Sequence, residues 1–120
     1  MRYAECDPMG VAHHTAYPVW LEMGRTELLR DAGATYRALE DAGILLVVVT
    51  LSIRYRRPAK YDDMLTLITR LAGTSKVKIE HEYELRRGDE ILATAETTLA
   101  CVDRSGKAQP IPDSVPLPVN

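Results

Sequence analysis

The spacing of hydrophobic residues changes once along the chain, from a helical period to a strand period. Between residues 16 and 33 apolar positions recur every three or four residues, which predicts an amphipathic helix. Thr15 is the expected N-cap, Pro18 falls in the first turn and Gly33 is the expected stop. The expected apolar face holds Ala16, Tyr17, Val19, Trp20, Leu21, Met23, Gly24 and Leu28, with Glu22, Arg25 and Thr26 opposite.

A second, shorter helix is expected over residues 36–41, with Gly43 after it. From Ile44 onward a period of two predicts strands. One strand begins at Ile44 and ends before Pro58, and the others cover residues 64–71, 76–86 and 91–102. Gly73 and a turn at 87–89 separate these three, and another turn at 103–106 follows the last. Because the links are short, we expect an antiparallel meander with the long helix on its apolar face.

The composition is that of one globular domain. The chain has 120 residues, of which 46% are hydrophobic and 27% charged, and residues 109–120 form a proline-rich tail expected to be extended. A net charge of −2 gives no electrostatic case for nucleic acid, and no apolar run approaches the roughly 20 residues of a membrane span. Cys6 and Cys101 lack the pattern of a disulfide framework, so a reducing cytoplasm is the simplest compartment, and a disulfide between the two is the alternative, which depends on their geometry.

Candidate chemistry is concentrated just before the long helix, in residues 5–17. Asp7 lies on a Pro/Gly loop, and a carboxylate facing the positive end of a helix can attack a carbonyl whose oxygen the free amides polarise. The alternative is that Asp7 only starts a turn ahead of Pro8. His14, beside the cap, is equally well interpreted as a surface histidine. No metal site is expected, because no third ligand follows His13 and His14 at helical spacing.

Four other charged or titratable residues have simple structural explanations. Glu22 and Arg25 are three residues apart, so an intrahelical ion pair is the simple interpretation. Glu27 projects within the apolar face and is expected to meet another subunit or to pair with an arginine. His81 lies on the apolar side of an alternating strand, which favours a hydrogen-bonded core histidine over a catalyst.

Three groups of residues match a known family pattern. They are Tyr3–Gly10 followed by His14, Tyr17, Glu22 and Arg25; Ile53-Arg54-Tyr55 with Pro58 and residues 61–63; and Thr74-Ser75-Lys76. Together they closely resemble the hotdog-fold acyl-CoA thioesterases of the 4-hydroxybenzoyl-CoA thioesterase-like branch, over roughly residues 3–112. The family usually has a longer first strand than residues 1–4 provide.

The resemblance implies an α+β hotdog fold, an antiparallel sheet wrapped around one long helix, as a single domain over residues 1–120. It implies hydrolysis of acyl-CoA to a free acid and CoA, with no metal or prosthetic group. Family members form homodimers by joining sheet edges, often paired again into homotetramers, and the active site lies between two subunits. Asp7 would attack the thioester carbonyl or activate water, and the His14 backbone N–H would polarise that carbonyl.

The resemblance also points to residues that would bind the substrate. Tyr17 would line the acyl pocket, although residues on the apolar face of the predicted helix are more typically part of the core. The basic residues Arg54, Arg56, Arg57, Lys60, Lys76 and Lys78 either form a solvated face or grip the phosphates of coenzyme A. The family pattern favours Arg57, Lys60, Thr74, Ser75 and Lys76 for that role.

Two rival functions fit parts of the pattern. Hotdog-fold enoyl-thioester hydratases pair an aspartate with a histidine five residues later, and that position is Ala12 in this chain. A non-catalytic module that binds acyl-CoA is the other alternative, and the intact Asp7 loop argues against it.

Overall fold

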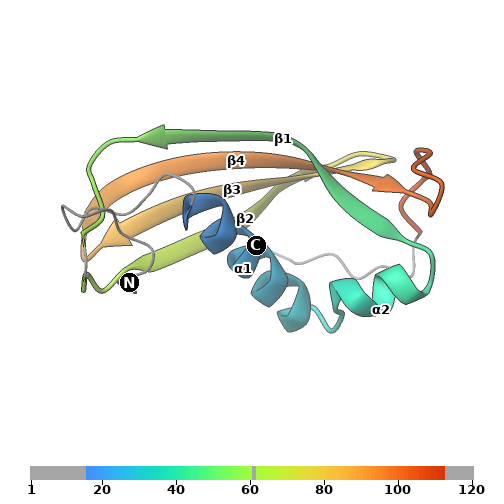
Figure 1. The fold of residues 1–120 in the computed structure, drawn as a ribbon, viewed down its shortest axis with the longest axis horizontal. Coiled ribbons are helices and arrows are strands. Elements are labelled where there is room, and N and C mark those ends of the chain that lie inside the picture. Colours follow the sequence, from blue (N-terminus) through green and yellow to red (C-terminus); the bar gives the residue numbers. More distant parts are fainter. Residues whose placement is uncertain (1–15, 61, 113–120) are drawn as a thin grey trace.

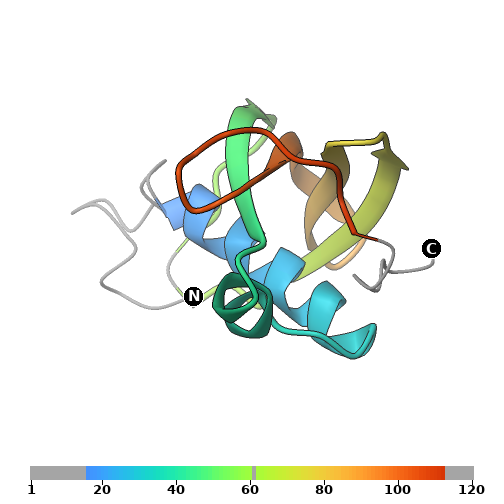
Figure 2. The same ribbon diagram turned by 90° about the vertical axis from the view of Figure 1, so that its right-hand side faces the viewer.

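The computed structural model describes residues 16–60 and 62–112 (Figure 1). The elements are α1 (Ala16–Asp31), α2 (Tyr36–Asp41), β1 (Leu45–Tyr55), β2 (Thr66–Thr74), β3 (Lys78–Arg87) and β4 (Glu90–Val102). The four strands form one antiparallel sheet, and α1 lies against one of its faces (Figures 1 and 2). The predicted α+β architecture with one long helix on a sheet is therefore confirmed.

The strand order corrects the expected meander. Strands β2, β3 and β4 follow one another as predicted, but β1 pairs with β4, which gives the order β1-β4-β3-β2. The link from β1 to β2 therefore crosses the end of the sheet from one edge to the other (Figure 1). Such a link needs to span only about 14 Å, three strand spacings, and a few extended residues reach that far. Short links in sequence do not by themselves force neighbours in the sheet.

Strand β2 also differs from the prediction at both ends. It begins at Thr66 rather than at residue 64, and Met64 before it is 87% exposed. It also continues past Gly73 to Thr74, with a register irregularity between Leu71 and Gly73. A glycine tolerates the local kink of such a bulge, so Gly73 bends the strand instead of ending it.

The helices begin and end largely where the sequence predicts. Pro18 lies in the first turn of α1. Helix α2 has the predicted bounds, Thr35 caps it by accepting a hydrogen bond from the Ala38 N–H at 3.1 Å, and Gly43 follows at φ +82°. That positive φ is the left-handed conformation in which helices commonly stop.

The buried face of α1 is narrower than the predicted apolar face and is rotated from it. Val19 and Met23 are 49% and 57% exposed, whereas Arg25 is buried. Residues four apart on a helix form one ridge, and the most deeply buried residues of α1 after Ala16 follow that ridge. Arg25 can be buried in this ridge because it forms a hydrogen bond with the hydroxyl of Tyr83 on β3. The buried residues of α1 are Ala16, Tyr17, Leu21, Arg25 and Leu29.

The core follows this ridge from one end of the sheet to the other. Beneath the start of α1, Tyr17 packs against buried residues that include Ala59 and Leu92. In the middle Leu21 meets Tyr83, and at the far end Leu29 packs against Leu39 of α2. Each end of the helix is therefore fixed to a different end of the sheet.

Two further expectations concern the whole molecule. Within the described ranges no helix combines the length and the hydropathy that a bilayer crossing needs. Cys101 is a fully buried free thiol. The predicted first strand at residues 1–4, the Thr15 cap and the tail beyond residue 112 lie outside the described residues.

Candidate functional site

Tyr17 fixes the start of α1 to the end of the sheet where β1 finishes. Its side chain is 5% exposed, its ring centroid lies 5.0 Å from that of Trp20, and Tyr55 meets it edge-on at 4.9 Å. Burial raises the pKa of the Tyr17 hydroxyl. This tyrosine therefore belongs to the core in the described structure, and a role in lining an acyl pocket stays a prediction.

The hollow beside Tyr17 is small. It measures about 10 Å³, and its lining includes Trp20, Leu21 and Tyr83. A volume of this size holds about one water molecule. It is too small for an acyl chain, so an acyl substrate does not fit in this hollow.

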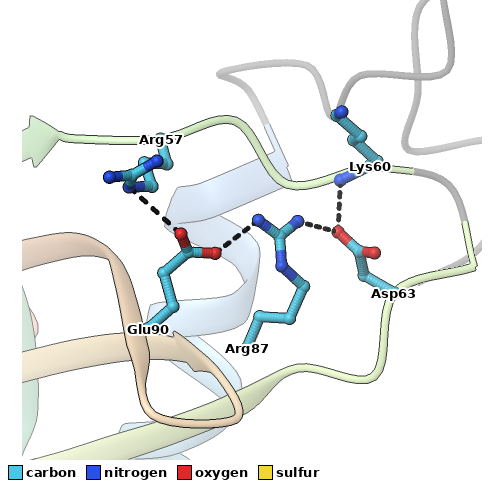
Figure 3. Close-up of polar contacts among 5 residues, drawn as sticks. All are labelled: Arg57, Lys60, Asp63, Arg87 and Glu90. Atoms are coloured by element: carbon cyan, nitrogen blue, oxygen red, sulfur yellow. Dashed lines mark hydrogen bonds and ion pairs between the residues drawn. The ribbon is translucent and has the colours of Figure 1, made fainter.

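A network of ion pairs holds the link between β1 and β2 near the start of α1 (Figure 3). Arg87 at the end of β3 pairs with Asp63 at 2.8 Å and with Glu90 at 2.6 Å. The Lys60 backbone N–H donates to Asp63 Oδ2 at 2.7 Å, and Arg57 Nε lies 3.1 Å from Glu90. The hairpin from β3 to β4 thus fixes the backbone that carries Arg57 and Lys60.

The electrostatics of this network follow from its contacts. The Lys60 N–H bond and then the Arg87 guanidinium lower the pKa of Asp63, and the hydrogen bonds to Glu90 and Asp63 raise the pKa of Arg87. Both groups therefore stay charged at neutral pH. A charged, stable network is a suitable support for the cations beside it.

The two predicted phosphate ligands in this link have their charged ends toward solvent. The Arg57 side chain is 65% exposed, and Glu90 contacts its Nε rather than its terminal nitrogens. Lys60 is exposed, and Figure 3 shows its ammonium pointing away from Asp63. Each side chain is therefore available to an anionic ligand at this end of the sheet.

Thr74, Ser75 and Lys76 lie at the opposite end of the sheet (Figure 1). The Ser75 N–H donates to the Lys78 carbonyl at 2.9 Å, and the Lys78 N–H returns to Ser75 Oγ at 3.2 Å. The Lys76 carbonyl accepts a hydrogen bond from Ile111 at 2.8 Å. Since β2 spans about 26 Å between the two ends, one protomer does not bring these residues together with Arg57 and Lys60.

The predicted catalytic pair, Asp7 and His14, lies outside the described residues, and its geometry stays a prediction. In the described part of the chain, no cluster of three or more His, Cys, Asp or Glu side chains is placed to hold a metal ion.

A second polar cluster lies inside the core, midway along α1. Arg25 Nη1 donates to Tyr83 Oη at 3.2 Å, and that hydroxyl shares a 2.6 Å hydrogen bond with Thr97. Nearby, His81 is 4% exposed; burial, and then the charge of Arg25, lower its pKa to about 4. His81 is thus a core histidine, as predicted, but its Nδ1 has no hydrogen-bond partner in the described structure.

Two sequence expectations about α1 are settled by these contacts. Arg25 points into the core instead of forming the intrahelical ion pair expected with Glu22. Glu27 pairs with Arg30 at 3.0 Å, so the arginine alternative is confirmed.

The ion-pair roles of Asp63, Arg87 and Glu90 and the burial of Arg25 were not predicted from the sequence. A signal existed for Arg25, because Tyr17, Leu21, Arg25 and Leu29 recur at intervals of four. The ion-pair network left no comparable signal, since its members come from a loop and a hairpin that only the strand order brings together.

Comparisons with known proteins agree with this architecture. The family model described as the thioesterase-like superfamily matches residues 1–116. The acyl-CoA thioesterase YbgC of Haemophilus influenzae is 36% identical over 110 residues, which cover 91% of this chain and 80% of that protein.

Two solved structures share the fold and confirm the predicted hotdog class. A hypothetical protein, TT1821, from Thermus thermophilus has a TM-score of 0.90 and 36% identity, covering 96% of this chain and 88% of that one. A DHNA-CoA thioesterase from Staphylococcus aureus has a TM-score of 0.87 and 28% identity, covering 92% and 75%.

Proposed function

The chain belongs to the thioesterase-like superfamily and is a thioester hydrolase, and from that premise we propose that it hydrolyses an acyl-CoA to a free acid and coenzyme A. The observation that carries the proposal is the family match over residues 1–116, which includes the Asp7 loop and the whole of α1. A thioester is a reactive electrophile with a good leaving group, so one carboxylate suffices without a catalytic triad.

Asp7 is the proposed catalytic group. Its carboxylate either takes a proton from water, which then attacks the acyl carbon, or attacks that carbon itself to give an anhydride that water cleaves. In both routes the carbonyl oxygen gains charge, the C–S bond breaks and CoA leaves as its thiolate. The His14 backbone N–H and the positive end of α1 favour that charge on the oxygen.

We propose that the complete site needs two copies of the chain. Arg57 and Lys60 lie at the end of the sheet near the start of α1, whereas Thr74, Ser75 and Lys76 lie at the other end. Edge strand β1 carries exposed apolar residues that suit pairing with a second copy: Val47, Val48, Val49 and Leu51. Antiparallel pairing of two β1 edges about a two-fold axis would bring opposite ends of the two sheets together.

In this arrangement both groups of residues bind one coenzyme A molecule. Arg57 and Lys60 of one copy and Thr74-Ser75-Lys76 of the other approach its phosphates, while Tyr17 lies beside the acyl group. The dimer, which can pair again into a tetramer, acts as a single-domain enzyme over residues 1–120 of each chain, and a reducing cytoplasm suits its free Cys101 thiol.

The test is thiol release from a panel of short, long, branched and aromatic acyl-CoAs, with Asp7→Asn beside wild type. We expect Asp7→Asn to lower turnover by roughly a hundredfold or more, because it removes the catalytic carboxylate. Asp89→Asn, at the exposed β3–β4 turn, is the matched control and should retain the wild-type rate. Similar rates for wild type and Asp7→Asn would refute the role of Asp7.

The same assay separates the two alternatives. A hydratase would add water to an enoyl-CoA without releasing thiol, but it needs a histidine where this chain has Ala12. A binding module would hold CoA tightly and release thiol from none of the panel.

A further inference from the structure

A cavity of about 360 Å³ is lined by residues of α1 and α2, by Leu46 near the start of β1 and by Leu99 near the end of β4. A volume of this size is typical of sites for small organic ligands. It lies away from the helix start, because Arg25 in its wall is about 13 Å along α1 from Ala16 at 1.5 Å per residue. The lining includes Arg25, Arg30, Arg37, Tyr36, Leu46 and Leu99.

Arg25 is the unusual member of this wall. Its side chain is only 8% exposed, and its hydrogen bonds go to two hydroxyls, those of Tyr83 at 3.2 Å and of Tyr36. No ion pair within the described ranges includes Arg25. A buried guanidinium is normally balanced by an anion, because leaving its charge desolvated and unpaired is costly. Residues 16–60 and 62–112 thus offer a buried positive charge to a cavity without pairing it with a negative one.

The other charges of the wall do not replace that missing anion. Glu22 and Glu40 line the cavity too, but both are exposed and hydrated. Arg30 is paired with Glu27, and Arg37 is exposed. Of the charged side chains that line the cavity in the described structure, only that of Arg25 is removed from water. Arg25 therefore determines that the cavity favours a negatively charged ligand.

The surroundings of Arg25 indicate what kind of anion fits. Leu99 is 1% exposed and Leu46 is half-buried, so part of the wall is apolar. The Tyr36 hydroxyl stands at the same cavity and accepts a hydrogen bond from Arg25. Burial raises its pKa, so it stays neutral and its proton can be donated to a ligand. A ligand with an oxyanion at one end and a hydrocarbon body at the other would satisfy both parts.

We propose that the cavity between α1 and α2 binds a small organic carboxylate, with Arg25 as its charge partner and Leu46 and Leu99 against its apolar body. A planar guanidinium binds a carboxylate well, because its N–H groups form a fork that matches the two oxygens. Arg37 at the mouth adds attraction for an approaching anion.

The direct test is calorimetric titration of the purified protein with benzoate, with neutral benzamide as the matched probe. We expect saturable binding of benzoate and at least tenfold weaker binding of benzamide. Equal affinity for the two probes, or no saturable binding of benzoate, would overturn the proposal.

Two substitutions locate the binding. Arg25→Met should abolish benzoate binding, and because this variant risks misfolding, Arg37→Gln on the exposed mouth serves as the second variant. We expect Arg37→Gln to weaken benzoate binding severalfold. Arg70→Gln, on an exposed arginine of β2 that does not line the cavity, should leave the affinity unchanged. Equal weakening by Arg37→Gln and Arg70→Gln would mean that only general surface charge attracts the anion, and would overturn the site.

The carboxylate has two possible sources, which kinetics distinguish. If it is the distal carboxylate of an acyl-CoA, adipoyl-CoA should exceed hexanoyl-CoA in kcat/KM, and Arg37→Gln should remove the preference. If it is a free acid, added benzoate should change the rate and the two substrates should perform alike. Both outcomes support the site.

The titration needs no turnover, so it separates this proposal from the proposed function. Benzoate binding without hydrolysis would refute only the proposed function, and hydrolysis without benzoate binding would refute only the binding site in this cavity.

Discussion

Arg87 donates a hydrogen bond to Asp63 at 2.8 Å and thereby joins the end of strand β3 to the link that crosses the sheet. Its other terminal nitrogen contacts Glu90 at 2.6 Å, and Glu90 in turn reaches Arg57. The guanidinium is thus the central group of a network whose outer members, Arg57 and Lys60, are the proposed phosphate ligands (Figure 3).

Arg87→Met should release this link. We expect a modest fall in the free energy of unfolding, because the network is partly exposed to water. Urea unfolding at low salt and at 1 M salt measures it, and salt should shrink the difference. Arg70→Gln is the control, because its pair with Glu82 is half-exposed and 3.8 Å long, and it should cost no more than about 0.5 kcal/mol. Equal losses in the two variants would contradict a special role for Arg87.

Gly24 permits the close approach of α1 to β2. A Cβ at this position would lie 2.3 Å from Thr69 Oγ1 and 2.8 Å from Leu67 Cδ2. Gly24→Ala should therefore lower the free energy of unfolding by about 1–3 kcal/mol, despite the gain of about 1 kcal/mol that alanine brings to a helix. Thermal and urea unfolding measure the change.

Thr69→Ala supplies the rescue for that substitution. The Thr69 hydroxyl is buried and has no hydrogen-bond partner in the described structure, so its removal is inexpensive. In the Thr69→Ala background the same Gly24→Ala change should cost clearly less, because only the end of the Leu67 side chain, at 2.8 Å, still has to shift. Gly73→Ala is a glycine control, because its Cβ would meet only Glu80 Oε2 at an ordinary 3.5 Å. A Gly24→Ala variant as stable as wild type would show that the helix shifts at little cost.

The elements were predictable from the sequence because their signals are local. The period change near Ile44, Pro18 in the first turn and Gly43 after α2 each act through neighbouring residues. The position of β1 beside β4 was not predictable, because hydrophobic alternation fixes which face of a strand is buried but not which strand pairs with it. The burial of Arg25 depends in the same way on Tyr83 being opposite it, and the ion-pair network depends on the strand order.

His81 should make stability depend on pH. Its folded pKa of about 4 lies below the ordinary value of 6.5, so the folded state favours the neutral ring. The contribution of the neutral His81 ring to the free energy of unfolding is fully present above about pH 6.5 and is lost as the pH falls toward 4. In that range the imidazole binds a proton in the unfolded chain but stays neutral in the folded chain. The loss reaches about 3 kcal/mol at most.

Urea unfolding of wild type and His81→Leu from pH 7.5 to 4.5 tests this expectation. The variant lacks the titrating ring, so the stability difference between the two proteins should shift in favour of the variant as the pH falls. His13, His14 and the carboxylates are common to both proteins and cancel in the comparison. A difference that stays constant with pH would show that His81 is protonated as readily in the folded state as in the unfolded chain.

The placement of the proposed coenzyme A ligands at opposite ends of the sheet makes a prediction about mixed dimers. Asp7→Asn should be inactive, and Lys76→Gln should raise KM roughly tenfold by removing one charged phosphate contact. If Asp7 of one copy works with Lys76 of the other, a heterodimer of these two variants contains one fully wild-type site. Unfolding and refolding the variants together should therefore restore about half of the wild-type kcat/KM per heterodimer, measured by thiol release at low substrate. If both residues serve the same copy, every site stays defective and mixing restores nothing. Adding Val48→Lys to both chains is the control, because a charge on the exposed β1 edge should prevent pairing and abolish the rescue.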